Sequence, residues 1–495
     1  MEENLALSKK LDDNVELFKK IFKNHEDINY RILENIYNKK IRICLISVDS
    51  MIDKVLVNDN ILKPIILTKI EDLNFSKNNL DRIANSVTLT NEIKRTSNID
   101  ELVSSLLYGD AILMFDGIDE ATLIGSRHLE TRNITLPSSE RTINGPKEGF
   151  VELISVNISL IRRRIRSSNL VFKFKEIGTE SKTIISYCYI EGIVNNKVVT
   201  ELENRLSKIK DIDAIFSTEH IIELISDEPY SPFDTTGTTE RPDAVVGKLL
   251  EGRVAILVDG CPTVVTIPFV FQEYFQASED YYINYYFASI NRFIRYVCFF
   301  LTISTPALYI SLVTFHREMI PTPLLLSIIS ARQGVPLPSI LETLLLLFVF
   351  EILREAGVRF PEQVGSAVGI VGALIIGEAA VTARLVSAPI VIVVALTAIS
   401  GFLVFSLQAA IIIIRVTLLI MVGFLGVYGY IFGMIIVALH LMSLRSFGVP
   451  YMLNMTSLRS QDLKDTIIRA PWPSMRLRPK IIGKNNPVRK KTNYK

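Results

Sequence analysis

The spacing of apolar residues divides the chain into two parts. Up to about residue 292, Lys, Asp, Glu and Asn are mixed with short runs of Ile, Leu and Val, as in a globular domain. Between Phe293 and Leu444 most residues are apolar, and several runs approach the roughly 20 residues that a helix needs to cross a bilayer. The pattern predicts a cytoplasmic α/β region followed by an α-helical transmembrane bundle.

The first part contains an internal repeat. Residues 100–117, DELVSSLLYGDAILMFDG, align without a gap to residues 243–260, DAVVGKLLEGRVAILVDG. In both copies, pairs of apolar residues recur at helical spacing and a Gly follows where helices commonly end. A short apolar run then leads into an Asp-Gly turn. Each copy therefore predicts a helix, a strand, a tight turn and a second strand.

Weaker matches extend the repeat towards the N-terminus. Val15–Leu17 matches Val151–Leu153 at the start of a predicted helix, and Ile41–Val48 matches Thr183–Ile190 as a strand. We infer two similar α/β subdomains; chance similarity between two βαβ-like pieces is the alternative. The predicted domains are an N-terminal helical segment (1–34), two subdomains (35–140 and 147–268), an interfacial aromatic linker (269–292), membrane helices (293–444) and a basic tail (445–495).

The flanks of the apolar region indicate its orientation. Arg292 and Arg295 precede the first apolar run, and basic residues outnumber acidic ones after Leu444. Positive flanks stay in the cytoplasm, so both termini are predicted to be cytoplasmic and the number of crossings to be even. The N-terminus lacks the basic start and apolar run of a signal peptide, which agrees with this orientation.

Two segments decide the number of crossings. Ile340–Leu353 is apolar, but Glu342 and Glu351 lie within it, and Ile411–Leu441 is long for one span and contains several glycines. We expect four crossings, with Ile340–Leu353 only partly inserted. Six are expected if each of the two segments adds one.

Small and charged residues inside the apolar region are candidate functional positions. Val364–Val386 has small residues at three- and four-residue steps, which allows helix backbones to approach closely. These residues are Gly365, Gly369, Gly372, Ala373 and Gly377. Charged side chains in such segments face protein or water rather than lipid. The candidates for intramembrane charge pairs are Arg354, Arg384 and Arg415.

A basic cluster ends the predicted helix Phe150–Ile165. Arg162, Arg163 and Arg164 are candidates for contact with anionic lipid head groups or with an acidic partner. The alternative is a solvated helix end, where cations are favoured by the helix dipole.

The sequence offers no signature of an enzyme, a metal site or a nucleic-acid binder. Its four cysteines are isolated, without a CxxC pair or a Cys/His cluster. GxxxxGK[ST], HExxH and GxSxG are missing from the sequence, and Gly178–Thr183 lacks the Gly-Lys step of a phosphate loop. The net charge of +2 does not indicate a polyanionic partner. We predict a non-enzymatic protein without cofactor or metal.

Several segments resemble one protein family. They are EGFVELISVNISLIRRRI, SPFDTTGTTERPDAVVGKLLEGRVAILVDGCPTVVTIPFVFQEYFQASEDYY, RQGVPLPSILETLLLLFVFEILREAGVRFP, VGIVGALIIGEAAV and PWPSM. In these segments the chain resembles the A subunit of the spore germinant receptors of endospore-forming bacteria, from about Asp100 to Arg478. The first hundred residues resemble the family less closely.

The resemblance implies a location and partners. Such receptors lie in the inner membrane of the dormant spore, where the A subunit works with a transporter-like B subunit and a lipid-anchored C subunit. Together they respond to small nutrients and trigger the release of ions from the spore core. In this family the A subunit is proposed to oligomerise into a ring whose membrane helices form the ion path. We therefore expect self-association and contact with membrane lipid.

The resemblance also suggests residues for the ion path. The candidates are Glu351, Glu355, Glu378 and Gln408. An acidic lining would favour cations. For each acid the alternative is an interhelical ion pair, for instance Glu378 with Arg384 or Arg415.

Two other functions remain open at this point. In a scaffold, the soluble subdomains would assemble the receptor and no ion would cross this subunit. A secondary transporter is the other alternative, although transporters commonly carry an internal repeat in the membrane half, whereas here the repeat lies in the soluble half.

Overall fold

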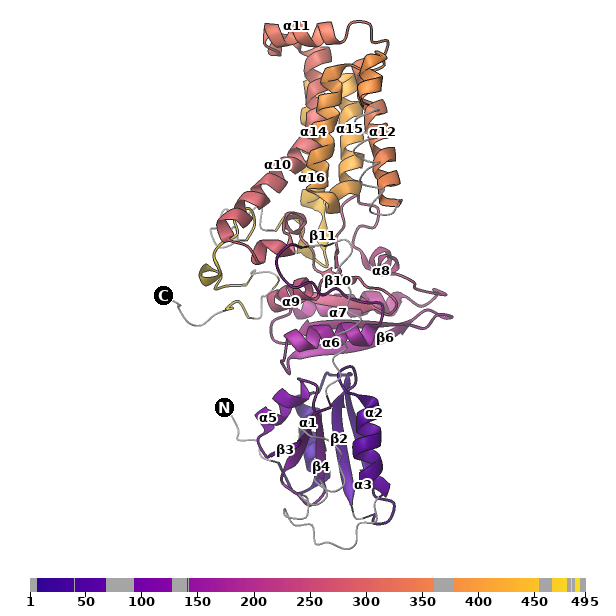
Figure 1. Ribbon diagram of the computed structural model, residues 1–495, viewed down its shortest axis with the longest axis vertical. Helices are drawn as coiled ribbons and strands as arrows, with labels where there is room; N and C mark the ends of the chain where they lie inside the picture. The colour runs from indigo at the N-terminus through magenta and orange to yellow at the C-terminus, as the bar shows by residue number, and fades with distance from the viewer. Residues whose placement is uncertain are drawn as a thin grey trace.

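The computed structural model describes residues 7–39, 41–67, 93–126, 140, 142–359, 377–453, 465–478, 482 and 486–489. A first α/β subdomain lies at one end of the long axis, a second lies in the middle, and a bundle of long helices forms the other end (Figure 1). This arrangement confirms the predicted fold class of two similar α/β subdomains followed by a helical bundle.

The first subdomain is built on an antiparallel sheet in the order β1-β2-β4-β5-β3. Its elements are α1 (Leu11–Ile21), β1 (Ile28–Glu34), β2 (Arg42–Val48), α2 (Lys54–Val57), η1 (Asn58–Leu62), α3 (Lys63–Leu67), β3 (Ile93–Thr96), α5 (Ile99–Leu106), β4 (Ala111–Phe115) and β5 (Ala121–Ile124). Ile112 and Met114 pack with α1 and α5, whereas Leu113 and Phe115 pack with α2, η1 and α3. Helices cover both faces, which is why β4 is apolar throughout.

The second subdomain repeats this plan, with the sheet order β6-β7-β9-β10-β8. Its elements are α6 (Ile154–Arg164), β6 (Leu170–Ile177), β7 (Thr183–Ile190), α7 (Asn196–Lys208), α8 (Thr218–Ile225), β8 (Gly237–Thr239), α9 (Pro242–Glu251), β9 (Val254–Val258) and β10 (Val264–Ile267). Helices α6 and α9 cover one face and α7 and α8 the other. Pro242 begins α9, and Gly252 ends it in the left-handed conformation.

Matching hydrogen bonds confirm the predicted similarity of the subdomains. The Asp116 carboxylate accepts from the Leu11 amide at 3.0 Å, as Asp259 accepts from Ile154 at 3.2 Å. The Asp-Gly turn of the repeat thus caps the first helix of its own subdomain in both copies. The strand match was aligned correctly, because Ile43 pairs with Phe115 of β4 and the equivalent Ile185 pairs with Val258 of β9.

Two details of the predicted repeat are wrong. The match of Val15–Leu17 to Val151–Leu153 is out of register, because α6 begins only at Ile154 and α1 begins at Leu11. The segment predicted as helical over residues 1–34 also contains β1, whose Glu34 pairs with Arg42. A domain boundary at residue 35 would therefore cut through the first sheet.

The helical end contains α10 (Tyr285–Ile310), η4 (Ser311–Phe315), α11 (Thr322–Ala331), α12 (Ser339–Arg359), α14 (Ala388–Phe402), η6 (Phe405–Leu407), α15 (Gln408–Leu425) and α16 (Val427–Ser443). Helices α12, α14, α15 and α16 run side by side along the bundle with the upper half of α10, and α11 lies across its far end (Figure 1). Among the described residues, Tyr285–Phe315 and Phe405–Leu425 are long and apolar enough to cross a membrane.

The two ambiguous segments now have defined structures. Ile340–Leu353 lies within α12, a regular helix packed against α14 and α15. Ile411–Leu441 is divided at Gly426 into α15 and α16, because Gly426 has a φ of 59° and a ψ of −136°. The number of membrane crossings stays a prediction.

The chain returns to the soluble region after α16. The side-chain hydroxyl of Ser446 donates to the Thr235 carbonyl at 2.6 Å and accepts from the Phe269 amide at 2.9 Å. Short elements fill this junction: η2 (Phe271–Phe275), η3 (Ser278–Tyr281), β11 (Arg445–Ser446), β12 (Val449–Pro450) and η7 (Trp472–Ser474). Phe271 and Phe275 belong to the same apolar core as the bundle helices, so the second subdomain and the bundle share buried surface.

Candidate functional site

A charge cluster links two helices in the middle of the bundle. The Arg415 guanidinium of α15 donates to Glu351 of α12 at 2.7 Å, and Arg354 pairs with the same carboxylate at 2.5 Å. The Arg415 side chain is only 3% exposed. The structure thus provides an interhelical pair, but Glu351 is the partner of Arg415, not Glu378 as the sequence suggested.

The other ion-path candidates lie apart from this cluster. Glu355 pairs with Arg359 one turn further along α12, and both side chains are largely exposed. Glu378 lies in a short helical stretch before α14 and is exposed. The side-chain carbonyl of Gln408, at the start of α15, is buried and has no hydrogen-bond partner in the described part of the chain. Arg384, at a φ of 55°, lies against Gly334.

The helix-packing candidates are mostly outside the described residues; these are Gly365, Gly369, Gly372 and Ala373. Gly377 is described, and a Cβ at this position would lie 3.6 Å from a methyl group of Val391 on α14. That distance is an ordinary van der Waals contact, so the described end of this segment approaches α14 without requiring glycine.

Another carboxylate in the bundle, Glu342, was noted within an apolar run of the sequence but was not selected as a functional candidate. Glu342, at the start of α12, is completely buried and accepts from the amide and hydroxyl of Ser387 at 3.0 and 2.9 Å. Arg332 donates to its other oxygen at 3.2 Å. Because Ser387 precedes α14, Glu342 anchors the beginnings of α12 and α14 together at the same end of the bundle.

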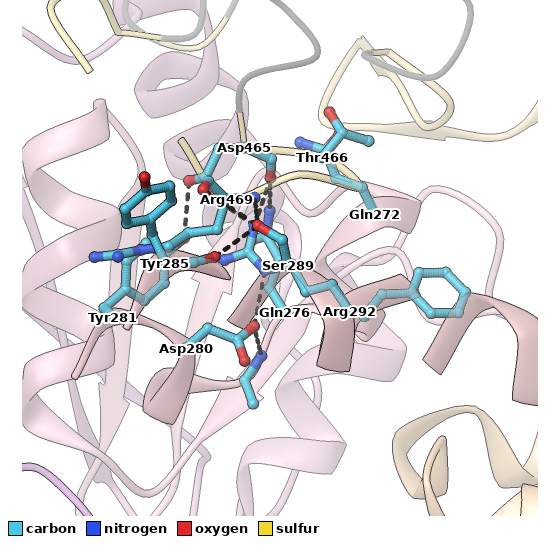
Figure 2. Close-up of polar contacts among 12 residues, drawn as sticks. Gln272, Gln276, Asp280, Tyr281, Tyr285, Ser289, Arg292, Asp465, Thr466 and Arg469 are labelled. Atoms are coloured by element: carbon cyan, nitrogen blue, oxygen red, sulfur yellow. Dashed lines mark hydrogen bonds and ion pairs between the residues drawn. The ribbon is translucent and has the colours of Figure 1, made fainter. Parts of the chain in front are cut away.

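Arginines that precede the first apolar run form the centre of a polar cluster at the junction (Figure 2). Arg292 donates from Nε to Asp280 at 2.8 Å and from Nη1 to the carboxylate of Asp465 at 2.7 Å. Arg295 donates to both oxygens of Asp280 at 2.9 Å. The side chains of Arg292 and Asp280 are 0% exposed, so this is a fully desolvated ion pair.

The same cluster joins a distant C-terminal segment, residues 465–478, to the linker and to α10, which directly follows the linker. Tyr281 donates its hydroxyl to Asp465 at 2.8 Å, and Gln276 donates to the Asp465 carbonyl at 2.6 Å. Ser289 of α10 accepts from the Arg469 amide at 3.1 Å. The linker, α10 and the C-terminal segment are therefore held together by polar contacts that replace those with water.

The basic cluster at the end of α6 has internal partners. Arg162 is fully buried and donates to both oxygens of Asp27, at 2.6 and 2.8 Å. Burial alone would raise the pKa of Asp27, but Arg162 and His25 outweigh burial and hold the pKa below its usual value. Arg163 and Arg164 both pair with Glu148.

Contact of Arg162 with lipid or with a partner is therefore excluded by its burial; it ties the second subdomain to the first. Its position in a basic triplet gave no sign of this, because Asp27 is distant in the sequence. For Arg163 and Arg164, whose side chains are about one-fifth exposed, such a contact stays a prediction.

Comparison with known proteins places the chain in a family. The model of the Bacillus/Clostridium GerA spore germination protein family matches residues 16–481. The chain belongs to this family. The predicted membership among germinant receptor A subunits is thereby confirmed, and the family consists of receptor proteins rather than enzymes.

The curated relatives cover nearly the whole chain. Spore germination protein KA of Bacillus subtilis (strain 168) is 39% identical over 491 residues, which is 99% of this chain and 89% of the relative. Spore germination protein B1 of the same organism is 35% identical over 96% of this chain and 98% of the relative. The uncharacterized membrane protein YfkQ, also from this organism, is 36% identical over 97% and 93%. The GerA member described here is a membrane protein.

A solved structure also matches part of the chain. The N-terminal domain of the A subunit of the Bacillus megaterium spore germinant receptor GerK3 shares 30% sequence identity, with a TM-score of 0.42. The match covers 55% of this chain and 99% of that structure.

Proposed function

We propose that this GerA protein is the membrane subunit of a nutrient germinant receptor in the spore inner membrane. It works there with a transporter-like B subunit and a lipid-anchored C subunit. Several copies assemble so that their membrane helices surround a cation path, which opens when a nutrient binds within the complex. The family membership supports the receptor role, and the polar residues of the bundle support the path.

The proposal of a cation path rests mainly on the exposed carboxylate of Glu378. It lies beside an apolar helix in a segment of small residues, and it has no ion pair with any described residue. An exposed charge at such a position avoids lipid and faces water or another protein chain. A ring of copies around a water-filled path satisfies this requirement, and acidic side chains along it would favour cations.

The remaining candidates differ in their fitness for the path. Glu351 is shared by two arginines, which offset its charge. Glu355 has one exposed partner, Arg359. Gln408 has a buried carbonyl oxygen that could accept from water or from an ion shell. We rank Glu378 first and Glu351 last as the group that touches the ion.

Cysteine scanning along residues 365–384 tests the path. Potassium release from spores that carry these variants is measured after addition of a nutrient mixture, with and without a thiol reagent. Block at positions spaced three or four apart would identify one helix face that lines water. Absence of block at every position, with the protein still in the membrane, would contradict a path along this segment.

Carboxamide variants separate the path from the bundle's internal pairs. Glu378→Gln is expected to alter potassium release and leave the amount of assembled receptor unchanged. Glu351→Gln leaves Arg415 buried without a full charge partner, so we expect it to lower both release and the amount of assembled receptor. Unchanged release in Glu378→Gln spores would remove Glu378 from the path.

A scaffold without an ion path is the second candidate. It is favoured by the ion pairs of Glu342 with Arg332 and of Glu351 with Arg415. A carboxylate that is paired inside the bundle has a structural role, which explains its presence without an ion path. In that case both the cysteine scan and Glu378→Gln would leave potassium release unchanged, whereas loss of the protein would abolish assembly of the B and C subunits.

The positions of the bundle ends support an even number of crossings. The start of α10 and the end of α16 both lie at the junction with the second subdomain (Figure 1). In place of the four crossings first expected from the sequence, we propose the alternative of six: α10, α12, the segment predicted over 364–386, α14, α15 and α16. Labelling of single cysteines from either side of the membrane tests this, and external labelling of the tail would refute it.

A further inference from the structure

The second subdomain, the linker and the C-terminal segment line an open-sided cavity of about 960 Å³. Its wall includes α9, the loop before β8, and Tyr281 of the linker, and it extends to Phe405 and Ser406 at the junction end of the bundle. Pockets for small ligands usually have volumes of about 300–1,000 Å³. The cavity is thus large enough for an organic ligand and lies close to the predicted membrane surface.

Most charged groups in the cavity wall already have partners. Arg253 donates to Glu273, and Lys248 lies 3.3 Å from the same carboxylate. Arg489 pairs with Glu251 at 3.2 Å. Burial would raise the pKa of Glu273, but Arg253 and Lys248 outweigh burial and lower it. These groups form a neutralised wall and do not call for a charged ligand.

Three charged groups in the wall lack an ion pair with any described residue: the carboxylates of Asp234 and Glu140, whose pKa values are raised by burial, and the guanidinium of Arg469. Arg469 is only 8% exposed, it lines the cavity, and it has no carboxylate within ion-pair distance among the described residues. Its side-chain Nε is buried and has no hydrogen-bond partner in the described part of the chain. The guanidinium lies over the ring of Tyr281, 5.8 Å from the centroid, and the two residues are neighbours in Figure 2. The Tyr281 hydroxyl already donates a hydrogen bond to Asp465.

A buried guanidinium without a counter-charge is costly, because desolvation is not offset by an ion pair. A ligand that brings an anionic group into the cavity would remove that cost. Arginine presents a planar set of donors that matches phosphate oxygens in bidentate fashion. The apolar and aromatic part of the wall, which includes Phe405 and Trp472, suits a ligand with an apolar portion.

We infer that this cavity binds a phosphate-bearing group on Arg469. The source of the phosphate is either the head group of an anionic lipid, which could enter beside Phe405, or a free phosphate compound. Either ligand would strengthen the attachment of the C-terminal segment to the start of α10, because the backbone amide of Arg469 already donates to the Ser289 hydroxyl. The site does not rest on the ion path of the proposed function.

The single tryptophan of the chain provides the assay. Trp472 lines the same cavity, and the Arg489 guanidinium lies 5.5 Å from its ring centroid. Full-length protein in neutral detergent is titrated separately with sodium phosphate, short-chain phosphatidylglycerol and sodium chloride at matched ionic strength, and Trp472 fluorescence is followed. We expect a saturable change with the phosphate-bearing probes and none with chloride. A change with the lipid alone identifies a lipid site, and a change with both identifies a site that free phosphate can fill.

Variants of two arginines in the same segment decide the assignment. Arg469→Gln should weaken binding at least about tenfold, since a charged hydrogen bond is lost. Arg476→Gln is the matched control, because Arg476 is exposed and outside the cavity; its affinity should stay unchanged. Without any probe, Arg469→Gln should keep or raise the unfolding temperature, because it removes an uncompensated buried charge.

Three results would overturn the proposal. They are a wild-type protein that gives no saturable change with either phosphate-bearing probe, an equal response to chloride, and an Arg469→Gln protein that binds as the wild type does. A lower unfolding temperature of Arg469→Gln without probe would show a structural role and also count against it. None of these measurements depends on potassium release, so the site and the ion path can fail independently.

Discussion

At the residue scale, several fully buried arginines lie where the fold places a carboxylate beside them. Arg162, Arg292 and Arg241 are among the largest side chains that are fully buried. Arg162 and Arg292 each join elements that are distant in the sequence, through Asp27 and through Asp280 with Asp465. Such pairs contribute little net free energy when complete, but removal of one partner leaves an uncompensated buried charge.

The Arg162–Asp27 pair gives a first prediction. Arg162→Ala should destabilise the contact between the subdomains by about 3–5 kcal/mol, whereas Arg163→Ala should cost about 0–1 kcal/mol because its ion pair is partly exposed. Hydrogen exchange of the β1 and β6 amides in the full-length protein measures the effect. Equal exchange in the two variants would contradict a special role of the buried pair.

The same pair predicts a dependence on pH. The folded protein holds the pKa of Asp27 below the ordinary aspartate value of 3.8. A depressed pKa contributes stability that is complete above the unfolded pKa and is lost as the pH falls through the folded pKa. Protection of β1 should therefore decline below about pH 4, and the decline should be smaller in Asp27→Asn. His25 and Arg162 are the charged or titratable groups that face Asp27. An equally steep decline in Asp27→Asn would assign the effect to other carboxyl groups.

At the element scale, close contact between α15 and α16 determines how the long C-terminal apolar run folds. Gly426 forms the turn, in a backbone conformation that side chains rarely adopt, and a Cβ there would lie 2.9 Å from Phe315. A Cβ on Gly429 would lie 2.2 Å from the Met421 carbonyl oxygen of the neighbouring helix. Two antiparallel helices can therefore pack with their backbones in contact.

Gly429 yields a third prediction. Gly429→Ala forces α15 and α16 apart, so it should destabilise the protein by about 1–3 kcal/mol. Gly247→Ala is the control, since its Cβ would meet nothing within 4 Å and alanine favours the helix interior by about 0.5–1 kcal/mol. Thermal unfolding in detergent distinguishes the two. A Gly429→Ala protein as stable as wild type would show that the helices can separate without cost.

At the scale of the whole molecule, the junction connects the soluble subdomains to the bundle. The linker contributes Phe271 and Phe275 to the bundle core, and the linker, α10 and the C-terminal segment share the cluster around Arg292. A movement of the second subdomain would therefore act directly on α10, because the described linker residues pack against both.

Loss of Arg292 tests this connection. Arg292→Gln should release the segment 465–478 from α10, since both Asp280 and Asp465 lose a charged partner. Trypsin should then cleave at Arg469 at least several times faster, and Trp472 fluorescence should shift. Arg317→Gln, at an exposed arginine near the far end of α10, is the control. Unchanged cleavage in Arg292→Gln would show that other contacts suffice to hold the segment.

The sequence by itself determined the features that depend on local pattern. Helical spacing, Gly stops and Asp-Gly turns predicted the repeated unit, because these signals act within a few residues. The length of the apolar runs predicted the helical bundle. Sequence motifs also identified the family. The first helix of the repeat was misaligned, because its match depended on a short triplet, and β1 was missed because an edge strand is half polar.

Only the tertiary structure decided which charged groups meet. Arg415 could have paired with Glu378 or with Glu351, and spacing along the chain does not distinguish them, because the choice depends on how α12 and α15 pack. Asp27, the partner of Arg162, and Asp465, one of the two carboxylate partners of Arg292, come from segments more than a hundred residues away. That Arg469 has no ion pair with a described residue could be recognised only once the groups around it were placed. Local pattern sets the elements, whereas the burial of charge is a property of the assembled fold.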